Sequence, residues 1–138
     1  MILQVGVKII LKNKEGEYLL LRRSAEKYPG IADLWDIPGG RIDPGSSLLD
    51  NLKREMMEET GLTLGGEPKL IAAQDILKNT NKHVVRLTYI GKADGEVKLD
   101  ANEHEFYKWF DWEEILKLED LDMYFKELLK DRIILDES

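Results

Sequence analysis

The sequence predicts an α/β protein in which helices pack against a mixed β-sheet, built as one domain over residues 1–138. Three observations support this prediction. Segments that alternate apolar and polar residues recur along the chain, as they do in half-buried strands. A segment in the middle and another near the end repeat apolar residues at helical spacing. The length suits a single hydrophobic core, and we find no repeat, low-complexity segment or linker.

The first third of the chain predicts a hairpin and a further short strand. Strands are expected at residues 5–10, 17–22 and 34–37, with turns or loops at 13–16, 23–33 and 41–45. The third strand is expected to stop at Pro38-Gly39-Gly40, because proline cannot donate to a sheet and glycine weakens a strand.

A helix is predicted next, starting near Ser46 or Ser47 and stopping at Gly61, which can take the left-handed conformation that ends a helix. Ser47 with Asp50 resembles a capping box, and Asp50 suits the positive end of the helix dipole. One face carries an apolar stripe of Leu49, Leu52 and Met56. This face is expected to pack against the sheet.

The second half of the chain predicts three more strands and two helices. The strands are expected at residues 69–77, 84–93 and 105–110, with turns at 79–81 and 94–95. A short helix is expected at 113–118, opened by Asp111 or Trp112, and an amphipathic helix from residue 122 to about 134. Trp109 is expected in the core.

Composition excludes several classes of site. The absence of cysteine excludes disulfides, zinc–thiolate sites and cysteine nucleophiles, and it fits a cytoplasmic protein. No apolar run approaches the roughly 18–20 residues that cross a bilayer, so no membrane partner is expected. The N-terminal segment lacks a cleavage-site pattern and is expected to belong to the mature fold. A net charge of −7 argues against a general nucleic-acid binder, and a polyanionic substrate would need bound cations or local arginines.

Three glutamates crowd one side of the predicted central helix. Glu55, Glu58 and Glu59 stand at i, i+3 and i+4, within a sector of roughly 100°. Like charges this close destabilise a helix unless a cation lies among them, which indicates a cation site. A solvated acidic face is the alternative, since most charge runs are of that kind. The glycines before the helix, Arg54 within it and Gly61 after it favour the cation site.

These residues resemble the Nudix box, written G-x5-E-x7-R-E-U-x-E-E-x-G-U with U aliphatic, over Gly40 to Leu62. Residues 54–62 read Arg-Glu-Met-Met-Glu-Glu-Thr-Gly-Leu and agree with every fixed position. The one departure is Ser46, which stands where the box has its first glutamate. Residues 35–40 before the box and 103–109 after it also look like this family, and in particular like its MutT-like members.

The resemblance implies an α/β/α sandwich with a mixed sheet and the box helix packed against it. It also implies hydrolysis of a nucleoside diphosphate linked to another group, assisted by Mg²⁺ or Mn²⁺. The expected partner is a small-molecule nucleotide rather than a nucleic-acid polymer, and a homodimer would be usual for the family. Trp35 just before the Pro-Gly-Gly turn favours a MutT-like nucleoside triphosphate pyrophosphohydrolase.

The resemblance also implies a set of metal ligands, namely the Gly39 carbonyl and the side chains of Glu55, Glu58, Glu59 and Glu103. Glu55 is a ligand or a base beside the ligands. Glu105 is the alternative to Glu103, and either one is equally explained as exposed charge. His104 between them is expected to be a hydrogen-bonded structural residue rather than a base.

Arg54 completes the expected catalytic set, because an arginine can orient a glutamate through charge-assisted hydrogen bonds. In the family, the glutamate that Ser46 replaces braces this arginine. Serine is a good helix cap, so the fold loses little. We therefore expect a weaker brace for Arg54 and a working enzyme.

The substrate-binding candidates are three arginines and two aromatic residues. Arg22 and Arg23 follow the second strand, and Arg41 stands beside the glycines, so each could bind phosphate. The resemblance places an arginine at Arg23, while a solvated strand end is the alternative for both. Trp35 and Tyr28 could stack on a base, and a place in the core is the alternative.

Two other functions on the same fold remain to be weighed. Residues 20–30 and 34–36 look like the equivalent region of isopentenyl diphosphate isomerases, but those enzymes rely on a catalytic cysteine and this chain has none. A non-catalytic nucleotide-binding protein is the other alternative. Regulators of that kind carry an additional DNA-binding domain, for which no residues remain in this sequence.

Overall fold

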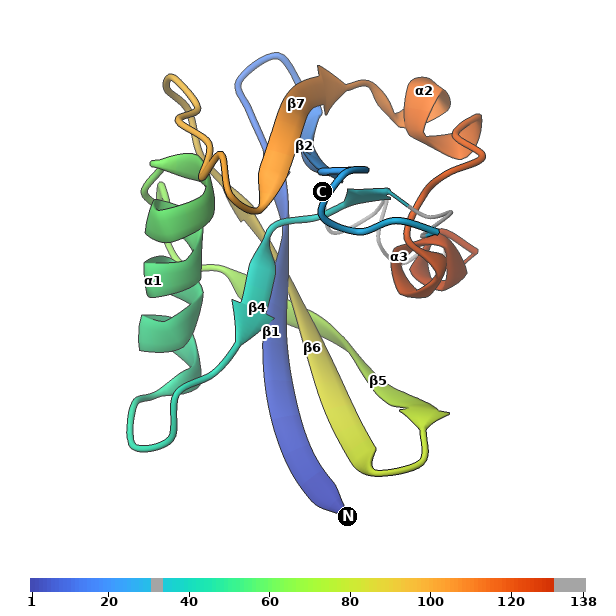
Figure 1. Cartoon of the computed structure of the whole chain (residues 1–138). Helices are drawn as coiled ribbons and strands as arrows, with labels where there is room; N and C mark the ends of the chain where they lie inside the picture. The colour runs from blue at the N-terminus through green and yellow to red at the C-terminus, as the bar shows by residue number, and fades with distance from the viewer. Residues whose placement is uncertain (31–33, 131–138) are drawn as a thin grey trace.

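The fold was obtained as a computed structural model that describes residues 1–30 and 34–130 (Figure 1). The predicted α/β architecture with a mixed sheet is confirmed. The strands are β1 (Ile2–Lys12), β2 (Tyr18–Arg23), β3 (Trp35–Asp36), β4 (Gly39–Arg41), β5 (Lys69–Asn79), β6 (Lys82–Lys92) and β7 (His104–Phe110). The helices are α1 (Leu48–Thr60), α2 (Trp112–Leu116) and α3 (Met123–Leu128).

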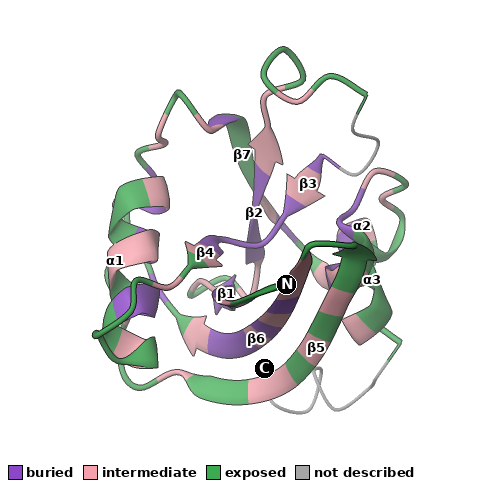
Figure 2. Ribbon diagram, turned by 60° about the horizontal axis from the view of Figure 1, so that its bottom comes forward, coloured by how far each residue is buried: buried purple, intermediate pink, exposed green. Residues whose placement is uncertain are grey.

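The sheet is mixed because one of its pairings is parallel. β1 runs parallel to β6 along its whole length, from Ile2 opposite Lys82 to Lys12 opposite Lys92. The other pairings are antiparallel, and they give the order β3-β2-β1-β6-β5, with β4 also on β1 and β7 also on β2. Figure 2 shows β5, at the sheet edge, without a buried residue, whereas β6 beside it carries buried and half-buried residues.

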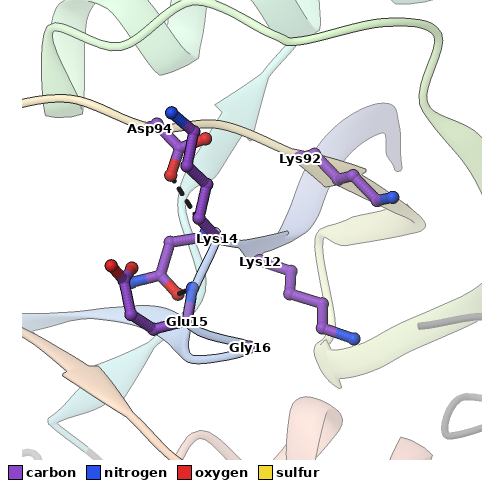
Figure 3. A pocket seen from close by; sticks show the side chains of 7 residues that line it. Lys12, Lys14, Glu15, Gly16, Lys92 and Asp94 are labelled. Carbon is purple, nitrogen blue, oxygen red and sulfur yellow. Dashed lines mark hydrogen bonds between the residues drawn. The ribbon is translucent and has the colours of Figure 1, made fainter.

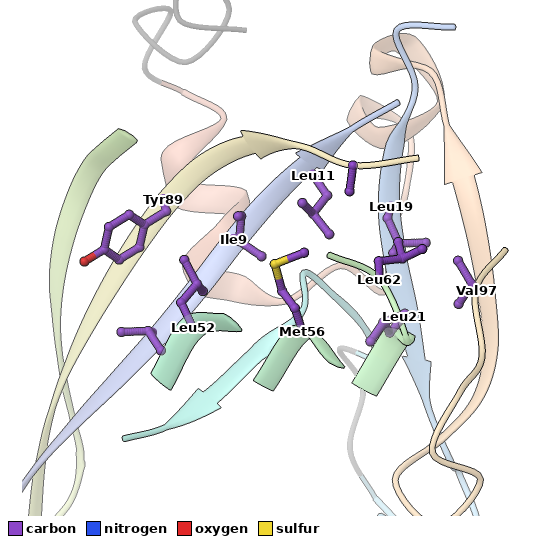
Figure 4. Close-up of a cluster of buried hydrophobic side chains, with 11 residues drawn as sticks. Ile9, Leu11, Leu19, Leu21, Leu52, Met56, Leu62, Tyr89 and Val97 are labelled. Carbon is purple, nitrogen blue, oxygen red and sulfur yellow. The ribbon is translucent and has the colours of Figure 1, made fainter. Parts of the chain in front are cut away.

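Alternation along the strands divides the core between the two faces of the sheet. Val7, Ile9 and Leu11 of β1 pack with Leu52 and Met56 of α1 on one face (Figure 4). On the other face, a second cluster joins strands β1, β2 and β7 to α2 and α3, with Ile10, Leu20, Phe110, Ile115 and Phe125 among its members. The helices thus cover both faces, which is the expected α/β/α sandwich.

The caps of α1 follow from its sequence. Ser47 Oγ accepts a hydrogen bond from the Asp50 N–H at 3.0 Å, and Gly61 has φ 71°, so both predicted ends are confirmed. The cap is one-sided, because the Asp50 side chain accepts no hydrogen bond from the Ser47 N–H. The reciprocal capping box forms instead at α2, between Asp111 and Glu114.

One element was missed, because residues 39–41 were expected to end a strand and begin a turn. They form β4, in which Gly39, Gly40 and Arg41 pair with Lys8, Val7 and Gly6 of β1. Gly39 has φ 136°, and a Cβ at that position would collide with the Val7 carbonyl oxygen. Gly39 therefore allows a close backbone approach rather than only a turn.

The remaining boundaries agree with the expected elements to within a few residues. Trp109 is partly buried against the α1-side cluster, as expected. The last helix is observed as Met123–Leu128, and residues 131–134 of the predicted helix lie outside the described part of the chain. In the described ranges, no helix is long and apolar enough to cross a membrane.

Candidate active site

A cleft of about 460 Å³ gathers side chains from all seven strands and from α1 and α3. Its lining carries both signs of charge. The acidic members are Asp36, Glu59, Glu103 and Asp122, and the cationic members are Lys8, Arg23, Arg41, Lys78 and Arg86. A concave site with convergent charged groups is the usual form of an active site. Of the three glutamates of the central helix, Glu59 lines this cleft.

Two of the three helix glutamates are held against the glycines of β4. The Gly39 N–H donates a hydrogen bond to Glu59 Oε1 at 2.6 Å. A Cβ at Gly40 would lie only 2.6 Å from Glu55 Oε2, so no larger residue fits there without displacing the Glu55 carboxylate. Glu58 is different, since its side chain is 56% exposed and does not line the cleft. The glycine pair thus positions Glu55 and Glu59 directly.

Burial makes these carboxylates hard to ionise. It raises the pKa of Glu59 to about 7, although nearby Lys8 and the Gly39 N–H oppose the shift. It also raises the pKa of Glu55, against the lowering effect of Arg54. Carboxylates with raised pKa values in a cleft are candidates for functional groups, because a bound cation would compensate them. The donor chemistry therefore suits a hard divalent cation.

The arrangement around these donors holds no assembled metal cage. Among residues 1–30 and 34–130, no three acidic or histidine side chains converge closely enough to bind a metal ion together. Arg54 lies among the glutamates instead, and its Nη1 donates to Glu55 Oε1 at 3.0 Å and to Glu58 Oε2 at 3.3 Å. The fit to a metal thus rests on the kind of donors and on their burial.

A buried ion-pair network forms the floor of the cleft. The Asp36 carboxylate forms ion pairs with Lys8 at 3.0 Å, with Arg23 at 3.1 Å and with Arg86 at 3.3 Å. Arg86 also forms an ion pair with Asp122 at 2.9 Å. Burial alone would raise the pKa of Asp36, but the three cations hold that pKa below its ordinary value. The carboxylate is therefore charged and fixes the cations in place.

The structure separates the predicted substrate-binding residues into two groups. Arg23, Arg41 and Tyr28 line the cleft. Arg22 and Trp35 do not. Arg22 pairs with Asp120 at 2.8 Å and stacks over the Trp35 ring at 5.5 Å, outside the cleft lining.

Trp35 packs edge-on against Phe110 at 5.1 Å between ring centroids, on the side of the second core cluster. This is the core placement that the sequence left open for Trp35.

The two downstream glutamates also separate. Glu103 lines the cleft and accepts a hydrogen bond from Tyr28 Oη at 3.0 Å. Glu105 instead lies 3.6 Å from Arg22 Nε. His104 Nε2 is 3.9 Å from Glu59 Oε2, and burial lowers the pKa of His104 to about 4, so the imidazole is neutral near pH 7.

Sequence reasoning missed Lys8, Asp36, Arg86 and Asp122 as parts of this site. A weak signal existed for two of them. Lys8 stands between Val7 and Ile9 in the apolar middle of β1, and Arg86 shares a face with the buried residues Val84 and Thr88. A charged residue at an inward strand position must find a partner, which marks it for attention.

A second hollow of about 440 Å³ lies at the β1–β2 turn and contains none of the predicted site residues (Figure 3). Three lysines, Lys12, Lys14 and Lys92, surround it, and Asp94 accepts the backbone N–H of Lys14 at 3.0 Å. It holds no group of acidic residues comparable to that of α1, so the cleft at α1 is the better candidate for catalysis.

Comparisons with known proteins match nearly the whole chain to one family. The family model described as "NUDIX domain" matches residues 2–131. The crystal structure of a MutT protein from Methanosarcina mazei Go1 superposes with a TM-score of 0.80 at 31% identity, over 99% of this chain and 96% of that chain. A Bacillus subtilis protein provisionally named an 8-oxo-dGTP diphosphatase is 31% identical over 104 residues, which is 75% of this chain and 64% of that protein. The CTP pyrophosphohydrolase of Escherichia coli is 29% identical over 82% of this chain and 80% of its own length.

Proposed function

Because the chain belongs to the Nudix hydrolase family, we propose that it is a metal-dependent hydrolase of nucleoside diphosphates linked to another group, and more narrowly a nucleoside triphosphate pyrophosphohydrolase. The observation that carries this proposal is a cleft lined by charges of both signs. Glu59 lines it, Glu55 lies close by against Gly40, and Lys8, Arg23 and Arg41 offer cationic groups in the same lining. A diphosphate needs cations on several oxygens at once, and such a cleft can provide them.

The proposed metal-binding residues are the Gly39 carbonyl with Glu55, Glu58, Glu59 and Glu103. Mg²⁺ or Mn²⁺ held there would neutralise the diphosphate and lower the pKa of the attacking water. Burial of Glu55 and Glu59 supports this assignment, since it raises the pKa of both carboxyl groups and a bound cation would favour their charged forms. Arg54 keeps Glu55 and Glu58 in one place through its hydrogen bonds.

Phosphate binding is proposed for the cations that line the cleft. Arg23 and Arg41 were expected there, and Lys8 joins them from the middle of β1. Arg22 and Trp35 are omitted from the proposed site, because they are engaged with Asp120 and Phe110 outside the cleft.

The substrate is proposed to be a small nucleotide. The names of two relatives, a CTP pyrophosphohydrolase and a protein provisionally named for 8-oxo-dGTP, suggest nucleoside triphosphates as the first panel to test. A homodimer and a cytoplasmic location stay predictions, the second supported by the absence of cysteine.

The test is a substrate screen with product analysis. Nucleoside triphosphates, oxidised dGTP, ADP-ribose, dinucleotides, isopentenyl diphosphate and a triphosphorylated RNA would be incubated with Mg²⁺ or Mn²⁺. We expect a nucleoside monophosphate and pyrophosphate from one or more triphosphates. Conversion of isopentenyl diphosphate to dimethylallyl diphosphate would contradict the proposal. Release of phosphate or pyrophosphate from the triphosphorylated RNA and from none of the small nucleotides would contradict it too.

The decisive variant combines Glu58→Gln with Glu59→Gln, which removes two proposed ligand charges at nearly constant volume. Turnover should become undetectable or fall by several orders of magnitude. The matched control is Glu67→Gln with Glu96→Gln, two exposed glutamates outside the cleft lining, which should leave turnover unchanged. If the first double variant kept its turnover, the site assignment would be wrong.

A further inference from the structure

Asn51 is a buried polar residue on α1 whose side chain is fully hydrogen-bonded. It is 1% exposed and stands beside the core residue Leu52. Its Nδ2 donates to the carbonyl oxygens of Ser46 at 3.2 Å and Ser47 at 2.8 Å. Its Oδ1 accepts from the Asp43 N–H at 2.8 Å and from Arg54 Nη2 at 3.0 Å. Burying an amide without these partners would be costly, so the side chain is held in one orientation.

That orientation follows from the partners themselves. Two carbonyl oxygens on one side of the amide require the NH₂ group there, and the two N–H donors on the other side require the oxygen. Asn51 Oδ1 is therefore fixed as an acceptor that faces Arg54. The loop before the helix and the arginine within the helix are joined through one side chain.

Arg54 also contacts two residues that precede the helix, Arg41 and Asp43. Its Nη2 also donates to the Arg41 carbonyl at 3.3 Å, and its Nε lies 3.4 Å from Asp43 Oδ2. Asp43 is largely exposed, so its ion pair with Arg54 contributes little. Ser46 contributes only its backbone carbonyl, through Asn51. Of the two side chains that contact Arg54 Nε and Nη2, Asp43 is exposed and Asn51 is buried.

We propose that Asn51 is a positioning residue. It holds Arg54, and through Arg54 the carboxylates of Glu55 and Glu58, and so takes over the bracing role of the glutamate that Ser46 replaces. The inference deepens the proposed function and rests on it for its kinetic consequences. Asn51 touches neither the cleft nor a proposed ligand atom. Its effect on turnover therefore passes through Arg54.

Two substitutions at Asn51 separate this role from a simple loop cap. Asn51→Asp loses both donations to the serine carbonyls and keeps an oxygen for Arg54. Asn51→Ala loses both functions. Residues that orient ligands typically cost roughly tenfold to a hundredfold in activity when removed, so we expect that loss in kcat for the alanine variant, with little change in KM. The aspartate variant should keep a kcat at least roughly tenfold above that of the alanine variant. Equal losses would show that Asn51 only caps the loop.

A second-site variant tests the same idea by rescue. Ser46 lies directly against Asn51, so a glutamate at position 46 could reach Arg54 when the amide is absent. Adding Ser46→Glu to Asn51→Ala should bring kcat back to within roughly threefold of the wild type. No rescue, together with equal losses in the two single variants, would overturn the proposal. The control is Asn13→Ala, an asparagine that accepts backbone N–H bonds in the β1–β2 turn, far from α1 in the chain; its kcat should not change.

One readout does not depend on turnover. The ¹⁵N–¹H signals of the Arg54 guanidinium, assigned with an Arg54→Lys spectrum, report whether rotation of this group is restricted. We expect restricted rotation in the wild type, in Asn51→Asp and in the rescued variant, and faster rotation in Asn51→Ala, where the contacts of Arg54 to Glu55, Glu58 and the Arg41 carbonyl are the ones that stay. Unchanged signals in Asn51→Ala would overturn the inference. If the wild type hydrolysed none of the nucleotides, the proposed function would fail, while these spectra would still decide whether Asn51 holds Arg54.

Discussion

Lys8 Nζ lies 3.0 Å from Asp36 Oδ2 at the floor of the cleft, where the Asp36 side chain is 3% exposed. The pair links the middle of β1 to the short strand β3. Arg23 and Arg86 share the same carboxylate, so one anion holds three cations. Two of these cations, Lys8 and Arg23, are proposed to bind phosphate, and their position therefore depends on the Asp36 carboxylate.

Neutralising Asp36 should destabilise the protein. Asn at position 36 would leave Lys8 and Arg86 buried with less compensation, and removing one partner of a buried ion pair costs about 3–5 kcal/mol. We expect a loss of that size in the free energy of unfolding of Asp36→Asn, measured with urea at pH 7. The control is Asp94→Asn, which changes an exposed aspartate at the second hollow and should cost little.

The same pair predicts how this loss depends on pH. The folded-state pKa of Asp36 lies below its unfolded value, so the stability it provides is fully present above the unfolded pKa of about 3.9. That stability is lost as the pH falls through the lower, folded-state pKa. The difference in unfolding free energy between wild type and Asp36→Asn should thus be constant from pH 7 to 5 and shrink below about pH 4. A difference that stayed constant into the acid range would contradict this assignment.

Two neighbouring methionines of α1 provide a matched test of the core. Met56 is fully buried against β1 (Figure 4), whereas Met57 is about half exposed. Met56→Ala should lower the free energy of unfolding by about 2–5 kcal/mol, because it removes buried surface and leaves a cavity. Met57→Ala should change it by less than about 0.5 kcal/mol. Chemical denaturation of the two variants measures both values, and equal losses would place Met57 in the core as well.

The local features of this fold could be predicted from the sequence, because short-range rules decide them. Ser47 and Gly61 mark the ends of α1, and the spacing of its glutamates places them on one side without knowledge of the sheet. The MutT-like resemblance of the same stretch led to the right family.

The long-range features could not be predicted in this way. β4 exists because Gly39 and Gly40 pair with β1, which no local pattern indicates. Arg86 reaches the cleft because the parallel register sets it opposite Gly6 of β1. Such pairings join residues far apart in the chain and depend on which strand lies next to which. Arg23 could be predicted as a site residue, but its meeting with Lys8 and Arg86 at Asp36 became evident only from the sheet.

Gly40 should tolerate no side chain, for a reason that concerns catalysis more than folding. A Cβ at position 40 would lie 2.6 Å from Glu55 Oε2, the end of a flexible side chain that can move away. Gly40→Ala should therefore fold, but with the Glu55 carboxylate displaced. A misplacement near 1 Å can cost on the order of a hundredfold in rate, so kcat should fall steeply while the melting temperature changes little. The control is Gly65→Ala, whose Cβ would meet only the Lys92 carbonyl at an ordinary 3.5 Å and should leave kcat unchanged.

Glu103 and Glu105 give a final test of which downstream glutamate serves the cleft. Arg22 pairs with Phe106 and Arg23 with His104, so Glu105 is the extra residue of a bulge. The bulge lets Glu105 meet Arg22 while Glu103 faces Tyr28 in the cleft.

Glu103→Gln should lower the Mg²⁺-dependent kcat by roughly tenfold to a hundredfold, as expected for a group that holds or orients a metal. Glu105→Gln should remove only a half-exposed ion pair, leaving kcat within roughly threefold of the wild type and stability within about 1 kcal/mol. Steady-state kinetics over a range of Mg²⁺ concentrations would show weaker binding of the activating Mg²⁺ in Glu103→Gln and not in Glu105→Gln. The reverse order of effects would transfer the metal-binding role to Glu105 and require the Arg22 contact to open, because the arginine occupies that carboxylate in the folded protein.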